Sequence, residues 1–146
     1  MHLYFIENGK RYLYDTVCGG ICEVTRLQKE MLPYVQKLDR PLPDVCPTTL
    51  RYSLAKYEVS AINEAYKSIM KLIGDGLLSI DDECHGADSV KIRFEDTELT
   101  VALRAAKLAI NGIPTVEAVE TVGADEVLFE KFTREIQEGF SFVTVK

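Results

Sequence analysis

The residues best suited to chemistry are two cysteines separated by a glycine pair, in the run Cys18-Gly-Gly-Ile-Cys22. Thiolates are good zinc ligands, and Cys84 or His85 would add donors. Residues four apart in an extended strand lie about 13 Å apart, so both sulfurs reach one ion only if the glycine turn folds them together. A strong zinc signal has two short cysteine pairs, and this chain has one. We therefore expect reduced thiols, with no metal and no other cofactor.

The sequence shows no group of residues with the types and spacing of a catalytic site. The two histidines are His2, beside the start, and His85, which follows the acidic run 81–83. No phosphate loop, dinucleotide fingerprint or nucleophile elbow occurs. The acidic run is typical of a solvated hinge, although a cation site is the alternative. The sequence predicts no catalytic residue, so we expect a non-enzymatic protein, with the role of accessory subunit to a modifying enzyme left open.

Composition and charge limit the partners. The chain has 146 residues, 47% hydrophobic content and a net charge of −6. Residues 1–85 carry −2 and residues 86–146 carry −4, and neither part shows the basic stripe that neutralises phosphates. No apolar run is long enough to span a membrane, and the start is polar too early for a signal peptide. We expect a cytoplasmic protein that binds neither nucleic acid nor membrane.

The first eighty residues have the pattern of three strands followed by three helices. Asn8-Gly9 predicts a tight hairpin between strands 2–7 and 11–15, and Gly19-Gly20 turns the chain into a third strand, 21–24. Thr25 and Gln28 form a capping box for the first helix, in which Pro33 predicts a kink or break. Thr48 or Thr49 caps a second helix and Ser60 a third. The third helix carries a core stripe at helical spacing: Ile62, Tyr66, Ile69 and Ile73.

The remainder predicts a second domain. A strand over 90–94, a helix from Thr97 to Ile110, a short helix over 115–122, a longer helix through Ile136 and a final strand over 140–145 are expected. The predicted class is therefore α+β: a winged-helix-like meander with three helices, then a mostly helical second half with one or two strands. The predicted domains are 1–81 and 88–146, joined by a linker over 82–87.

The third strand of a three-stranded meander is an edge, and an edge presents unpaired N–H and C=O groups. An extended peptide can add to such an edge through main-chain hydrogen bonds, with alternate side chains directed to either face. Glu23 offers the alternative, an edge that is only protected by charge. The residues alone leave these two interpretations balanced.

A resemblance favours peptide binding. The run Leu54…Tyr57…Ile62-x-Glu64-Ala65…Ile69-x-x-Leu72…Asp75-Gly76-Leu77-Leu78-Ser79, with the preceding meander, resembles the peptide-recognition element of ribosomal peptide natural-product biosynthesis. That element is similar to the small chaperone of pyrroloquinoline quinone synthesis, and it occurs at the N-terminus of radical S-adenosylmethionine peptide maturases. The resemblance covers about residues 1–81.

The resemblance implies a partner and a site. In this family a precursor's leader peptide lies between the third strand and the third helix and pairs with the strand. Carried onto this chain, the peptide-binding residues are Ile21, Cys22, Glu23 and Val24 on the strand and Asn63, Lys67, Met70 and Lys71 on the helix. Lys67 and Lys71 lie one turn apart and would meet acidic leader side chains. The implied role is to capture a leader peptide and present it to a separate modifying enzyme, such as a radical maturase.

Two departures keep alternatives open. A radical maturase has a Cys-x-x-x-Cys-x-x-Cys signature, whereas here position 25 is Thr25, so this chain is no complete maturase. Pro33 is also unexpected in the first helix. The alternatives are a winged-helix DNA-binding regulator, which a basic third helix would favour, and a degenerate maturase fragment. The second half would dock the enzyme, form a homodimer or act as a further binding domain.

Overall fold

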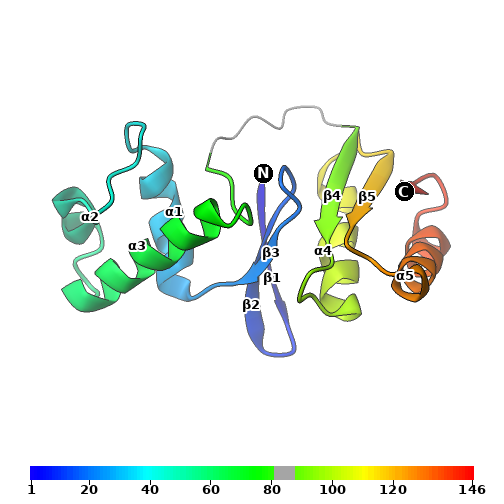
Figure 1. The fold of residues 1–146 in the computed structure, drawn as a ribbon, viewed down its shortest axis with the longest axis horizontal. Coiled ribbons are helices and arrows are strands. Elements are labelled where there is room, and N and C mark those ends of the chain that lie inside the picture. Colours follow the sequence, from blue (N-terminus) through cyan, green and yellow to red (C-terminus); the bar gives the residue numbers. More distant parts are fainter. Residues whose placement is uncertain (81–87) are drawn as a thin grey trace. The chain divides into compact units, whose positions relative to one another are not determined.

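The computed structural model describes residues 1–80 and 88–146. The strands are β1 (His2–Glu7), β2 (Lys10–Asp15), β3 (Ile21–Glu23), β4 (Ser89–Arg93), β5 (Ala118–Val122) and β6 (Thr144–Val145). The helices are α1 (Arg26–Gln36), α2 (Thr48–Ser53), α3 (Val59–Gly74), α4 (Leu99–Gly112) and α5 (Glu126–Gly139) (Figure 1). The predicted α+β class is confirmed.

The chain divides into two compact units. The sheet unit consists of residues 1–23 and 88–146, and the helical unit consists of residues 24–80. This division differs from the predicted domains, because the meander groups with the second half of the chain rather than with the three helices that follow it. The predicted linker, 82–87, lies outside the described residues. No helix in the described part of the chain is long and apolar enough to cross a bilayer.

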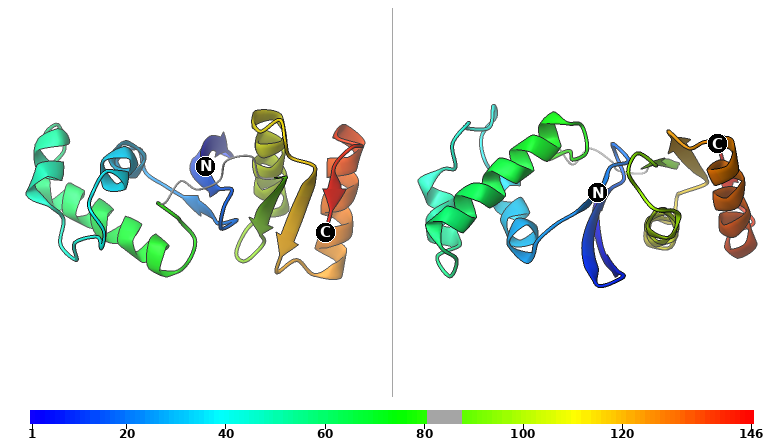
Figure 2. Two further views of the ribbon diagram at one scale, coloured as in Figure 1. Left: turned by 90° about the horizontal axis from the view of Figure 1, so that it is seen from above. Right: turned by 60° about the horizontal axis from the view of Figure 1, so that its bottom comes forward.

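Two three-stranded sheets form the sheet unit. The antiparallel sheet has the order β1-β2-β3, and its hairpin is closed by Asn8 and Gly9, with φ of 53° and 75°. These two positive φ angles are those that a type I′ turn requires, as the Asn-Gly pair predicted. The second sheet is parallel, with the order β4-β5-β6, and its strands are connected through α4 and α5 (Figure 2).

The parallel sheet corrects one sequence prediction. Residues 115–122 were expected to form a short helix, but residues 118–122 form β5, which pairs with β4 along its whole length. Val119 is fully buried opposite Val90, and Thr121 lies opposite Ile92. Pairing with a buried neighbouring strand therefore decides the conformation of this β-branched segment, because so short a segment has little helical preference of its own.

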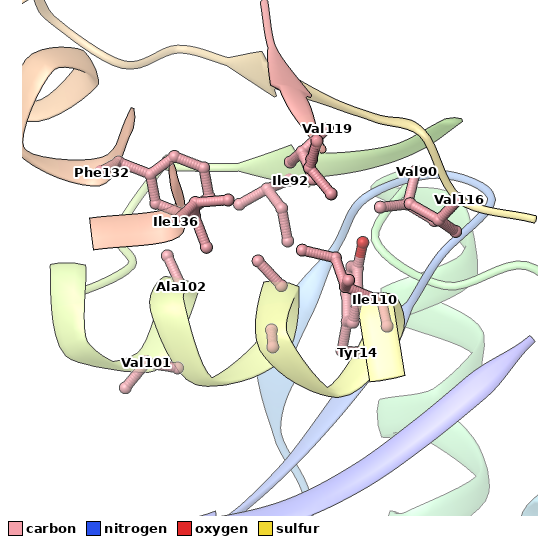
Figure 3. Close-up of a cluster of buried hydrophobic side chains, with 14 of the residues drawn as sticks. Tyr14, Val90, Ile92, Val101, Ala102, Ile110, Val116, Val119, Phe132 and Ile136 are labelled. Atoms are coloured by element: carbon pink, nitrogen blue, oxygen red, sulfur yellow. The ribbon is translucent and has the colours of Figure 1, made fainter. Parts of the chain in front are cut away.

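One hydrophobic core joins both sheets of the sheet unit. Phe5 and Tyr14 from the meander share a buried cluster with the parallel sheet and with α4 and α5. Figure 3 shows Tyr14 within this cluster. The buried face of α4 consists largely of alanines, which allow close approach of backbone on either side: Ala102, Ala105, Ala106 and Ala109. Phe94 and Phe132 meet edge to face with ring centroids 5.1 Å apart. This shared core explains why the meander belongs with the second half of the chain.

The helical unit forms around α1 and α3. Thr25 and Gln28 exchange the two hydrogen bonds of the predicted capping box, at 3.1 and 2.8 Å. The predicted break at Pro33 does not occur: α1 continues through it, with Pro33 exposed and Met31, Leu32 and Val35 buried. On α3, the predicted stripe is fully buried at Ile62, Tyr66 and Ile69 and half-buried at Ile73. α3 starts at Val59, with Glu58 rather than Ser60 as its N-cap residue.

Candidate peptide-binding site

The edge strand β3 is placed by the turn that precedes it. Asp15 and Gly20 close this turn, with the Asp15 N–H donating to the Gly20 carbonyl at 3.0 Å. The Gly19 N–H donates back to the Asp15 carbonyl at 2.8 Å, and Gly19 adopts a φ of +81°. A residue other than glycine is strained at this angle, so the Gly19-Gly20 pair is needed to start β3 where it does.

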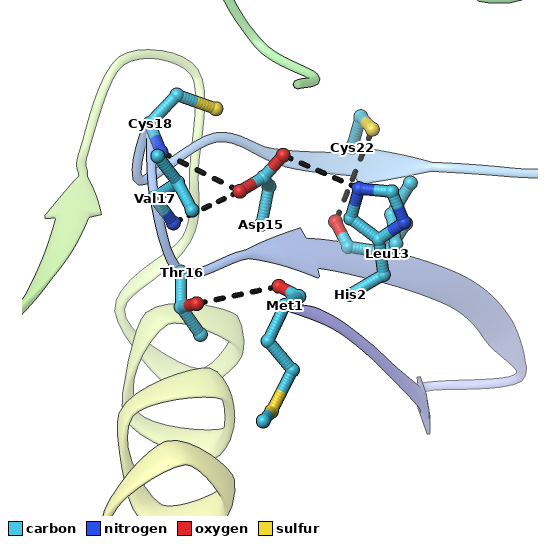
Figure 4. A network of polar contacts seen from close by, with 8 residues as sticks. All are labelled: Met1, His2, Leu13, Asp15, Thr16, Val17, Cys18 and Cys22. Carbon is cyan, nitrogen blue, oxygen red and sulfur yellow. Dashed lines mark hydrogen bonds and ion pairs between the residues drawn. The ribbon is translucent and has the colours of Figure 1, made fainter. Parts of the chain in front are cut away.

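The Asp15 carboxylate holds the turn from within. It is 1% exposed, and its Oδ1 accepts hydrogen bonds from the Val17 and Cys18 N–H groups at 2.9 and 3.4 Å (Figure 4). Its Oδ2 lies 3.4 Å from the Nε2 of His2. A buried carboxylate is costly unless such partners satisfy it. These contacts hold the Asp15 side chain in one position between β2 and β3.

The same turn is attached to the parallel sheet. The Arg93 N–H donates to the Gly19 carbonyl at 3.0 Å, and its Nε donates to the Cys18 carbonyl at 3.1 Å. The Tyr14 hydroxyl donates to the Lys91 carbonyl. A Cβ at Gly19 would lie 2.8 Å from the Cβ of Lys91, too close for any side chain. These contacts therefore attach the start of β3 to β4, and they give the main-chain N–H of Arg93 a hydrogen-bond partner at the end of β4.

The backbone groups of β3 divide between its two edges. Ladder hydrogen bonds in an antiparallel pair alternate along the strand. The bond between Asp15 and Gly20 fixes the alternation, and Leu13 opposite Cys22 is the next bonded pair. Ile21 and Glu23 consequently direct their N–H and C=O groups away from β2. This is the open edge that the meander pattern predicts.

A hollow of about 240 Å³ lies beside this edge, entirely within the sheet unit. Ile21 and Glu23 line it from β3, and the segment before α4 lines it from the other side. Its complete lining is Lys10, Tyr12, Ile21, Glu23, Asp96, Thr97, Glu98 and Val101. A strand added to β3 would have room here for side chains on this face of the sheet.

The predicted helix residues lie on α3 of the helical unit. Lys67 and Lys71 are exposed, whereas Asn63 and Met70 are half-buried. The Oδ1 of Asn63 accepts a hydrogen bond of 3.4 Å from the Nη2 of Arg51 on α2. Asn63 and Lys67 line a second hollow, of about 200 Å³, with Asp44, Val45, Cys46, Glu64 and Tyr66.

The predicted site residues fall into two sets. Ile21, Cys22 and Glu23 form β3 in the sheet unit, whereas buried Val24 and the four α3 residues belong to the helical unit. Each set is assembled by its own unit, and a shared groove stays a prediction. Arg51 was missed by sequence reasoning, because its position beside Leu50 on a short helix carries no distinguishing pattern.

Cys18, Cys22 and Cys46 are free thiols that are buried or half-buried. Burial raises the pKa of Cys22 to about 11, with Cys18 and Asp15 adding to the effect, and burial also raises the pKa of Cys18. Protonated thiols are poor nucleophiles and poor metal ligands. Within residues 1–80 and 88–146, no three His, Cys, Asp or Glu side chains are grouped to hold a metal ion. Cys84, His85 and the acidic run 81–83 lie outside the described residues.

No protein-family model matches this sequence, and no curated protein matches it either.

Proposed function

We propose that this protein binds an extended peptide, the leader of a precursor, by adding it as a strand to β3. The bound leader is then presented to a separate peptide-modifying enzyme, such as a radical maturase, and this chain performs no chemistry on it. The observation that carries the proposal is the open edge of β3, where Ile21 and Glu23 direct their main-chain groups outward.

The surroundings of the edge support this proposal. Strand addition gains affinity from main-chain bonds only if the edge is fixed beforehand, because ordering a mobile edge would cost conformational entropy. The Asp15 network and the bonds from Arg93 fix β3 at its start. The hollow beside Ile21 and Glu23 then accommodates side chains and so gives selectivity among peptides.

Binding is tested by titrating fluorescently labelled candidate leaders, taken from short peptides encoded beside this gene, into the full chain. We expect saturable binding, and no binding at several hundred micromolar for any candidate would refute the proposal. Random duplex DNA and an unrelated peptide of equal length and charge are the controls.

The strand mode has its own test. Proline at position 23 removes the outward N–H while leaving the Cys22 bonds to Leu13 in place. We expect Glu23→Pro to weaken leader binding at least tenfold, with Glu23→Ala as the control that keeps the N–H. Leaders N-methylated at successive residues should lose affinity at every second position, and uniform tolerance of N-methylation would exclude a strand.

A further inference from the structure

The hollow of about 240 Å³ beside β3 combines apolar and charged walls, all within the sheet unit. Val101 is buried, and Tyr12 and Ile21 are half-buried. The charged residues that line the hollow are all exposed: Lys10, Glu23, Asp96 and Glu98. Lysine and arginine match such a hollow, because a long apolar stem carries their charge to the water-exposed rim.

The charge around this hollow is negative. Three carboxylates line it against the single ammonium group of Lys10. Among the residues that the structure describes, none of these four side chains takes part in an ion pair, so no neighbouring cation neutralises the carboxylates. The start of α4 adds a partial positive charge of about one half, which with Lys10 offsets only part of the three negative charges. The hollow therefore attracts a cation and repels an anion.

The Glu98 carboxylate is not used to cap α4. Glu98 is the N-cap residue of this helix, but its side chain accepts no hydrogen bond from the first turn. Asp125 has the same position at α5, and its side chain accepts a hydrogen bond from the Leu128 N–H at 2.8 Å. Capping therefore accounts for the acidic residue before α5 but not for the one before α4.

The direction of an added strand decides which of its side chains reach the hollow. Both pairs within this sheet are antiparallel, and antiparallel addition continues the same ladder. Directly opposite residues of antiparallel strands direct their side chains to one face. Ile21 and Glu23 both line the hollow, so the peptide residues opposite them face it as well. An antiparallel peptide passes Glu23 first and Ile21 two residues later.

We infer that β3 selects a peptide that carries a lysine or arginine opposite Glu23 and an apolar residue opposite Ile21, two positions further along. The stem of the basic side chain lies against the apolar residues of the hollow, and its charge lies among the carboxylates of β3 and of the segment before α4. This inference rests on the proposed peptide-binding function and names the side chains that the peptide must carry.

The preference is tested with synthetic peptides of the form acetyl-Thr-Xaa-Thr-Val-Thr-amide, in which Xaa is arginine, lysine, glutamine or glutamate. Affinities for the full chain are measured from backbone amide NMR shifts. We expect the arginine and lysine peptides to bind about fivefold more tightly than the glutamine peptide, and the glutamate peptide to bind most weakly. Their shifts should centre on residues 21–23 and 96–101. Equal affinities of the arginine and glutamine peptides, or no binding of any peptide at about 10 mM, would overturn the inference.

Two double variants test the carboxylates before α4. Asp96→Asn with Glu98→Gln removes two charges from the hollow, and asparagine suits the positive φ of 55° at position 96. This variant should reduce the preference for arginine over glutamine to about half. Glu126→Gln with Glu130→Gln removes two exposed carboxylates from α5, outside the hollow, and should leave the preference unchanged. Equal effects would show that the peptide responds only to net charge, which would overturn the inference.

Glu23 is tested by reversing its charge. Glu23→Lys leaves two cations and two carboxylates around the hollow, so the preference for the arginine over the glutamate peptide should disappear. A preference that persists unchanged would exclude Glu23 as the partner of the basic side chain. Glu23→Ala should weaken binding of a basic peptide about threefold, and the larger effect of Glu23→Pro is measured relative to it.

Failure of this inference can be distinguished from failure of the proposed function. Leaders that bind in the strand mode without a basic residue opposite Glu23 would refute the inference and leave the proposed function standing. Basic synthetic peptides that bind while no leader does would refute the proposed function and leave the preference of β3 standing.

Discussion

Asp15 in the sheet unit and Arg51 in the helical unit both carry charge below the surface, but their partners differ. Asp15 accepts two backbone hydrogen bonds and faces His2, so its oxygens are satisfied. Arg51 donates a long hydrogen bond to the neutral amide of Asn63 and lies beside the Cys46 thiol, and its Nε has no hydrogen-bond partner among the described residues. A satisfied buried charge stabilises the fold, whereas a half-buried charge with an unpartnered nitrogen adds a desolvation cost.

The largest effect is expected at Asp15. Asp15→Ala leaves the Val17 and Cys18 N–H groups and His2 without their acceptor, so the free energy of unfolding should fall by about 3 kcal/mol. Urea denaturation of the full chain, followed by circular dichroism, measures this. Glu130→Ala, which removes an exposed carboxylate from α5, is the control and should change stability by less than about 0.5 kcal/mol. An equal effect of both substitutions on the free energy of unfolding would contradict the structural role of Asp15.

The glycine turn offers a matched pair. Gly19 and Gly9 have φ of +81° and +75°, so alanine is strained at both by about 1 kcal/mol. A Cβ at Gly9 meets nothing within 4 Å, whereas one at Gly19 meets the Cβ of Lys91. Gly19→Ala should therefore cost about 2 kcal/mol and Gly9→Ala about half of that. Equal losses of unfolding free energy would show that the close approach of Gly19 to Lys91 does not penalise a side chain at position 19.

The partly buried thiol of Cys22 on β3 should make the free energy of unfolding depend on pH. The pKa of Cys22 is raised from 9.0 to about 11, so the folded chain keeps this proton over a range in which the unfolded chain loses it. Stability from this group is complete below pH 9 and is lost as pH rises towards 11. Between pH 8 and 10, unfolding free energy should fall about 1 kcal/mol more in the wild type than in Cys22→Ala. Parallel curves would contradict the raised pKa.

Local sequence signals predicted much of this fold. Asn8-Gly9 requires a tight hairpin, and Thr25 with Gln28 forms the capping box, because a few adjacent residues determine each feature. The buried stripe of α3 follows equally from its spacing. The open edge of β3 follows from the order of a meander, so the strand half of the candidate site was accessible from sequence.

Features that depend on distant partners were not accessible. β5 is a strand because β4 pairs with it, and the meander shares a core with α4 because Phe5 and Tyr14 find the alanine face there. Neither feature can be predicted from the order of residues within the segment itself. The same holds for the unpartnered Nε of Arg51, which is evident only in the folded unit.

The smallest effect on stability is expected at Arg51. This effect shows whether Arg51 contributes to stability as Asp15 does. Methionine has a similar length without the charge, so Arg51→Met removes an unsatisfied Nε and loses a long hydrogen bond to Asn63 and the contact with the Cys46 thiol. Replacing a half-buried charge that lacks a carboxylate partner by an apolar side chain is often neutral or stabilising, so the free energy of unfolding should change by less than about 0.5 kcal/mol. Asn63→Ala is the companion variant and should be equally mild. A loss of 2 kcal/mol or more at Arg51 would mean that this arginine, like Asp15, stabilises the fold.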